Sequence, residues 1–245
     1  MKEYGDELFI FAMALQASED REEEEDEQDE SEISVPFELK PPPSATAEQK
    51  DQMKIYLEGY YGAMNGAWPN LIVAMTQVKQ ELMELDAGDA SLYFLPEAAA
   101  EEVDLIMAEI NLGCLIDQHH ADFMRAANGW KGFYQSIDLF GTDDLACPQI
   151  MQNAFSRLNA VPSHVIEPTG FLREDLLPLA ASGTSSDLCV ITKQTASRPG
   201  KVIWITGEKA RLFPNFEEYF RAMTDNYRLM LLELSNEQKS SPAEQ

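Results

Sequence analysis

Apolar residues recur at helical spacing through much of the first half of the chain, and this pattern predicts helices there. The first helical stretch covers residues 46–86 and is interrupted at Asn65-Gly66. Its second part places Leu71, Met75, Val78, Leu82 and Leu85 on one apolar face. Another helix is expected to open at Pro96, which suits the first helical position. Its predicted buried face consists of Val103, Ile106, Met107 and Ile110.

The second half of the chain changes to strand patterns. Strands are predicted over residues 133–140, 187–192 and 202–206. The last two are expected to form an antiparallel hairpin, because Pro199-Gly200 is a turn signal between them. A helix is predicted for 148–158, and a final helix rich in Phe and Tyr follows Asn215, a good N-cap.

The junction at residues 122–132 connects these two halves. The segment begins as an amphipathic helix, and Asn128-Gly129 then provides the two residue types that most readily adopt a positive φ. Trp130 follows at once and is large enough to fold back on the helix. We therefore expect a helix-to-sheet junction fixed by an aromatic side chain.

Composition along the chain suggests four parts. An acidic N-terminal segment spans 1–46, in which 8–15 and 33–39 can pair as a hairpin around the acidic run 19–32. A helical extension packed on the core spans 47–95, an α+β domain spans 96–235, and a disordered tail spans 236–245.

The chain is strongly acidic. Its 245 residues include 18 Lys and Arg against 43 Asp and Glu, a formal net charge of −25. The first 46 residues hold fifteen acidic and three basic side chains, so the remainder still has a net charge of −13. Such a surface repels nucleic acid and anionic membranes and attracts basic proteins. The expected partner is therefore a protein with a basic surface.

Few residues suggest catalysis. The three cysteines, Cys114, Cys147 and Cys189, are widely spaced and odd in number, which favours a reduced, cytoplasmic compartment over a disulfide framework. His119 and His120 are adjacent, so they point about 100° apart on a helix and cannot chelate one ion as an i, i+4 pair does. We predict no enzyme activity, no cofactor and no metal. The alternative is a small hydrolase that uses His119, His120 or Cys189, with His164 as a base.

The order of motifs resembles the SMI1/KNR4 family of the SUKH superfamily. The matching segments are Phe123 with 128–130, then 139–141, 182–183 with 187–189, 199–204, and Phe213 with 216–219. The positions that carry the resemblance are Phe123, Asn128, Gly129, Trp130, Gly141, Gly200, Trp204 and Phe216. The first 95 residues have no counterpart in it.

The resemblance implies an α+β fold with a twisted, mainly antiparallel sheet flanked by helices, here with a helical N-terminal extension. It also implies an immunity protein that binds and neutralises a toxin used in bacterial competition, with a nuclease as the expected toxin. The alternative within the family is a regulatory scaffold that has no toxin partner. The candidate contact residues are acidic side chains expected beside the sheet, namely Asp138, Asp143, Asp144, Asp187 and Glu208.

Overall fold

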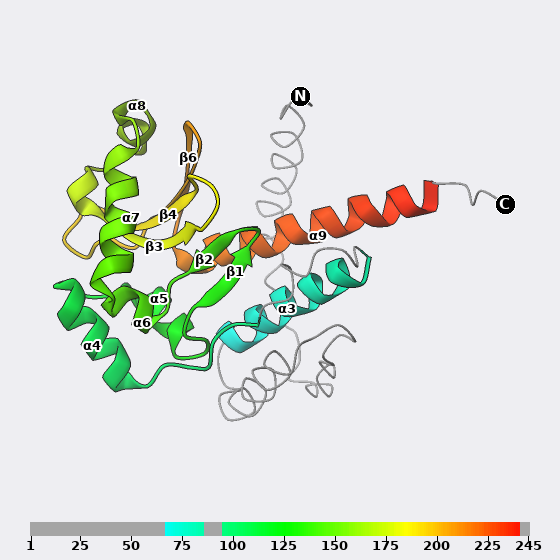
Figure 1. The fold of residues 1–245 in the computed structure, drawn as a ribbon, viewed down its shortest axis with the longest axis horizontal. Helices are drawn as coiled ribbons and strands as arrows, with labels where there is room; N and C mark the ends of the chain where they lie inside the picture. Colours follow the sequence, from blue (N-terminus) through cyan, green and yellow to red (C-terminus); the bar gives the residue numbers. More distant parts are fainter. Residues whose placement is uncertain (1–66, 86–94, 241–245) are drawn as a thin grey trace, which may run out of the picture. The chain divides into compact units, whose positions relative to one another are not determined.

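A computed structural model describes residues 67–85 and 95–240, and within them one antiparallel sheet has the strand order β1-β2-β3-β4-β5-β6 (Figure 1). The strands are β1 (Trp130–Tyr134), β2 (Ile137–Leu139), β3 (Leu176–Ser182), β4 (Leu188–Thr192), β5 (Val202–Thr206) and β6 (Lys209–Phe213). Each strand pairs with the next one along the chain, as antiparallel neighbours can. The predicted α+β class and the predicted hairpin of β4 and β5 are confirmed.

The described residues also form seven α-helices. These are α3 (Ala67–Leu85), α4 (Glu102–Leu112), α5 (Gln118–Met124), α6 (Thr142–Ala146), α7 (Pro148–Ala160), α8 (Ser163–Ile166) and α9 (Phe216–Ser240). Helices α3 and α9 lie side by side, whereas α4 packs against α6 (Figure 1). Short 3-10 turns at Glu167–Thr169 and Arg173–Asp175 precede β3.

The two faces of the sheet belong to two hydrophobic clusters. Along β4, Cys189 and Ile191 join the larger cluster, which includes side chains of α3, α5 and α9. The alternate residues Leu188 and Val190 join the smaller cluster with side chains of α7 and α8. This alternation is the period of two that a strand with both faces covered must show.

Two strand predictions differ from the structure. Residues 133–140 form a hairpin and not one strand, because Gln135 has a φ of 51° and reverses the chain so that Tyr134 pairs with Ile137. The Gln135 amide donates to the Tyr227 hydroxyl of α9 at 2.6 Å, which stabilises this turn. Strand β6 was not predicted; it pairs with β5 along its whole length.

The helix expected at Pro96 begins only at Glu102. The amides of Glu97 and Ala100 instead donate to the carbonyls of Gly129 and Met124, at 3.0 and 2.8 Å. These tertiary bonds hold 95–101 extended beside the helix-to-sheet junction.

Two short helices, α6 and α8, have no counterpart among the helices that the sequence predicts. Helix α9 continues to Ser240, so it is longer than the sequence predicts, because a disordered tail was expected from residue 236. The predictions for 1–66, 86–94 and 241–245, including the acidic hairpin and the first part of the helical extension, lie outside the described residues.

Candidate functional site

Two glycines bring the junction after α5 into backbone contact with the end of β2. Gly129 has a φ of 90°, and a Cβ there would lie 2.6 Å from the amide of Gly141. A Cβ on Gly141 would lie 2.2 Å from the Asn128 carbonyl oxygen. The Asn128 side chain closes the contact, because it accepts from the Thr142 amide at 2.7 Å and donates to the Thr142 hydroxyl at 2.8 Å. A side chain at either position would clash with the backbone, so only glycine fits at both. The positive φ of Gly129 agrees with the prediction that Asn128-Gly129 ends the helix.

Most of the aromatic positions of the resemblance meet in one core. Phe123 of α5 and Phe216 of α9 pack edge to face, with ring centroids 5.4 Å apart. Trp130 packs against Phe133 and Phe220, at 5.9 and 6.2 Å, and so contacts α9. Trp130 lies in β1 and is fully buried in the same hydrophobic cluster as Phe123 and Met124 of α5.

The other two positions of the resemblance lie on β5 and in the loop that precedes it. Trp204, partly buried on β5, packs edge to face on Tyr134 at 5.6 Å. Gly200 has a φ of 74°, and a Cβ there would lie 2.8 Å from Asp117 Oδ2. Gly200 thus lets the loop between β4 and β5 approach the start of α5, which Asp117 caps.

The five candidate contact acids come from four separate places in the fold. Asp138 on β2 accepts from the Gly132 amide at 2.7 Å, and Asp144 on α6 binds Lys131 at 2.9 Å. These two carboxylates are therefore engaged within the chain. Asp143 on α6 is exposed, Asp187 is half-buried before β4, and Glu208 is exposed between β5 and β6. Surface acidity is thus distributed over the fold.

Glu208 also borders a shallow pocket of about 220 Å³. The other side chains around it include His164 of α8 and the apolar Leu212 of β6. His164 and Glu208 are both exposed to water. The polar side chains at the edge of this pocket are therefore hydrated, and neither His164 nor Glu208 is buried as a reactive group in an active site often is.

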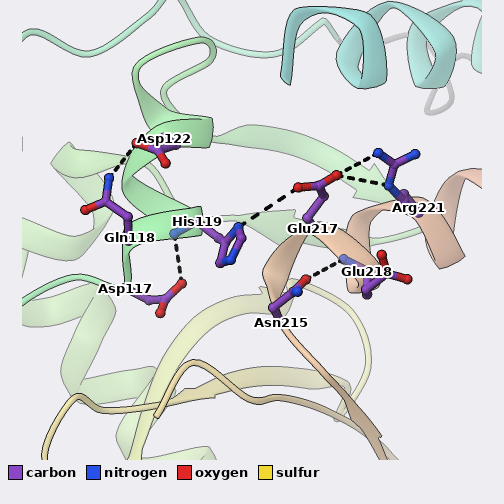
Figure 2. Close-up of polar contacts among 8 residues, drawn as sticks. All are labelled: Asp117, Gln118, His119, Asp122, Asn215, Glu217, Glu218 and Arg221. Carbon is purple, nitrogen blue, oxygen red and sulfur yellow. Dashed lines mark hydrogen bonds and ion pairs between the residues drawn. The ribbon is translucent and has the colours of Figure 1, made fainter. Parts of the chain in front are cut away.

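A polar cluster joins the first turns of α5 and α9 (Figure 2). His119 Nδ1 lies 4.0 Å from Glu217 Oε2, and Glu217 also pairs with Arg221 at 2.6 Å (Figure 2). Asp117 accepts from the His119 amide and Asn215 from the Glu218 amide, so both helices are capped. The predicted cap at Asn215 is confirmed.

His119 and His120 point in different directions, as their spacing predicts. His120 is only 1% exposed and lies 4.9 Å from the ring of Phe216. Burial lowers the pKa of His120 from 6.5 to about 4, so the imidazole is neutral at pH 7. The buried imidazole belongs to the core and is out of reach of a substrate.

The structure does not bring Cys189 and His164 together. Cys189 is fully buried on the α9 side of the sheet, and burial raises the pKa of its thiol. His164 lies on α8, whose Val165 and Ile166 pack on the opposite face. The two groups therefore cannot act as the nucleophile and base of the hydrolase alternative.

Lys79 is a buried lysine that the sequence pattern did not single out. Its side chain, 2% exposed on α3, donates to the carbonyls of Gly132 and Phe133 on the edge strand β1. The ammonium also lies 5.3 Å from the ring centroid of Trp130. Burial lowers the pKa of Lys79 from 10.5 to about 7, and the nearby charge of Asp138 opposes that shift. Helical spacing from Met75 places Lys79 on the apolar face, and this was the missed signal.

The predicted buried face of α4 is wrong. Leu105 and Ala108 are its buried side chains. The four residues expected inside are exposed, namely Val103, Ile106, Met107 and Ile110, which we call the apolar ridge.

Within the described residues there is no cluster of three His, Cys, Asp or Glu side chains that could hold a metal ion. No helix of these same segments has the length and apolar character needed to cross a bilayer. No family model and no curated protein matches the chain. The resemblance to the SMI1/KNR4 family therefore remains a prediction.

Proposed function

We propose that this chain is a protein-binding module that neutralises a basic partner protein by covering its working surface. In line with the SMI1/KNR4 resemblance, the partner is a toxin used in competition between bacteria, and this chain is the cytoplasmic immunity protein against it. A nuclease is the toxin class that the charge favours, because a nuclease holds phosphates with basic side chains.

The net charge of −25 carries this proposal. Opposite net charges steer two proteins together and raise their association rate by orders of magnitude. Fast capture is what a neutralising protein needs, since an unbound toxin acts at once. The exposed Asp143 and Glu208 supply part of this charge on the described body.

Co-expression with the product of the adjacent gene tests the proposal. We expect cells to tolerate that protein only when this chain is present, and the two to elute from gel filtration as a stoichiometric complex. The matched control expresses the adjacent protein alone.

Two results would contradict the proposal. Equal toxicity with and without this chain, together with separate elution, removes the neutralising function. A stoichiometric complex with a harmless partner identifies the scaffold alternative instead.

A further inference from the structure

We propose that the apolar ridge of α4 is the docking surface for an amphipathic helix of the partner, one that carries basic residues beside its apolar stripe. This inference rests on the proposed function, since it identifies where the partner binds and what its contact surface is made of.

The ridge is a continuous stripe of large apolar side chains. Its four members occupy positions i, i+3, i+4 and i+7 of one helix, so they lie on one face. They are between 50% and 66% exposed, and Leu115 just after the helix is 62% exposed. Scattered exposed apolar residues are ordinary, but a contiguous set of this kind indicates a binding surface.

The ridge is not the face that attaches α4 to the rest of the molecule. Leu105 and Ala108 are buried on the other side, and α4 packs against α6 (Figure 1). A capping box between Glu101 and Asp104 and a left-handed C-cap at Gly113 complete the helix ends. The ridge is therefore not needed to form or anchor the helix.

The charges around the ridge select the partner. Glu101 and Asp104 are exposed at the start of α4, and the chain as a whole has a net charge of −25. The nearby Arg125 is already paired with Glu102 at 2.6 Å and with Asp122 at 2.8 Å. A partner surface that is apolar and flanked by Lys or Arg matches this arrangement, whereas a second copy of this chain would add like charges.

The length of the ridge sets the size of the contact. Residues 103 to 110 span about 10 Å along the helix axis, which is two turns. An apolar stripe of two to three turns on a partner helix covers it when the apolar faces of the two helices pack against each other.

Three synthetic peptides of about 16 residues serve as probes of the full-length chain. The first is helical, with Leu at i, i+3, i+4 and i+7 spacing and Lys elsewhere. The second replaces each Lys by Glu, and the third replaces each Leu by Ser. We expect the Leu/Lys peptide to bind at least about tenfold more tightly than either of the others in fluorescence anisotropy.

The matched variants separate the ridge from general charge attraction. The double variant Ile106→Glu, Ile110→Glu makes the chain more acidic and removes the ridge. We expect it to bind the Leu/Lys peptide at least about tenfold more weakly. Leu232→Glu alters a similarly exposed leucine on α9 and should bind within about twofold of the original chain. Equal or tighter binding by the double variant would overturn the proposal, as would equal binding of the Leu/Glu or the Ser/Lys peptide.

Evidence that the ridge is covered by a second copy of the chain, or by other residues of the same chain, would also overturn the proposal. If the original chain sediments as a dimer and the double variant as a monomer, a second copy covers the ridge. If the melting temperature of the double variant falls by more than about 5 °C, residues of the same chain already cover it.

Repeating the co-expression experiment with the double variant distinguishes a failure of this inference from a failure of the proposed function. A toxin that binds the original chain and the double variant alike would leave the function intact and exclude the ridge as its contact. Failure of the original chain to form any complex would remove the function, and the peptide titration would still decide whether the ridge binds helices.

Discussion

Helices α3 and α4 depart from the hydrophobic rule in opposite directions. In α3 a lysine, Lys79, is buried against the edge strand β1, and its stem lies among the apolar residues of the core. In α4 two isoleucines, Ile106 and Ile110, are more than half exposed. The pattern of apolar and polar residues therefore fails to predict which of these side chains are buried in either helix.

The neighbours of the two helices explain the difference. Helix α3 lies along α9, and its Lys79 reaches the β1 carbonyls, so an amine there satisfies two backbone acceptors. Helix α4 contacts α6 on one side, and four of its apolar side chains remain exposed on another. A sequence pattern gives the chemistry of a face, but burial depends on which element lies opposite it.

Introducing the same residue into both helices gives the largest expected contrast. Lys79→Glu places a carboxylate against two carbonyl oxygens and near Asp138, with no partner for its charge. We expect it to lower the free energy of unfolding by about 4 kcal/mol or more. Ile106→Glu adds a charge where water already reaches, so its effect should stay within about 0.5 kcal/mol. Urea denaturation followed by tryptophan fluorescence measures both.

Residue type alone predicts the reverse order of destabilisation. Lys→Glu exchanges one charged residue for another, whereas Ile→Glu replaces an apolar residue by a charged one. The comparison fails if Ile106→Glu proves the more destabilising of the two. A Lys79→Glu variant as stable as the original chain would mean that this side chain leaves the core.

The pH dependence of stability tests the buried lysine of α3 by itself. Because the pKa of Lys79 is about 7 in the folded chain and 10.5 as its reference value, the unfolded chain binds the extra proton above pH 7. The free energy of unfolding therefore rises with pH, by at most about 1.4 kcal/mol per unit. Burial raises the pKa values of Cys189 and Tyr219 above their reference values of 9.0 and 10.0. These two groups therefore lower the free energy of unfolding as the pH rises, which opposes part of the effect of Lys79. We expect a gain of roughly 2 kcal/mol between pH 7 and 9.

Lys79→Met is the control for this titration, since it keeps the length of the side chain without an ionisable group. Urea denaturation at pH 7, 8 and 9 should show no rise for it, and only the slight fall toward pH 9 that Cys189 and Tyr219 contribute. His120 titrates below this window, because its pKa shift covers about 4 to 6.5. A rise of equal size in the methionine variant would assign the effect to other groups.

The parts of the fold that the sequence predicts carry strong local signals. Pro148 at the first position of α7 and Asn215 before α9 mark where those helices begin. Strand β6 was missed because Lys209-Ala-Arg-Leu-Phe213 lacks the β-branched residues that identify strands. The start of α4 was misplaced because Glu97 and Ala100 bond to distant carbonyls, which no local pattern encodes.

The candidate surface was harder to predict than the fold. Asp143 and Asp144 are adjacent and chemically identical, yet only Asp144 is held by Lys131 and the amide of Gly141. Which of two acids remains available depends on bonds between elements far apart in sequence. The spacing of the apolar ridge, in contrast, was visible in the sequence, and only its direction was wrong.

Alanine at matched isoleucines sharpens the comparison, and the smallest effect of all is expected at Ile106. Ile106→Ala should change the free energy of unfolding by only a few tenths of a kcal/mol and in the stabilising direction, because alanine has the higher helix propensity and little burial is lost. Ile72→Ala on α3, where the side chain is fully buried, should cost about 3 kcal/mol. Urea denaturation of both variants in parallel measures the difference.

This pair tests whether the ridge stabilises the fold or serves binding. A loss above about 1 kcal/mol for Ile106→Ala would mean that other residues of the chain pack on it. A neutral or stabilising result would leave large apolar side chains on α4 that stability does not require. Their spacing on one face would then favour a role in contact with another protein.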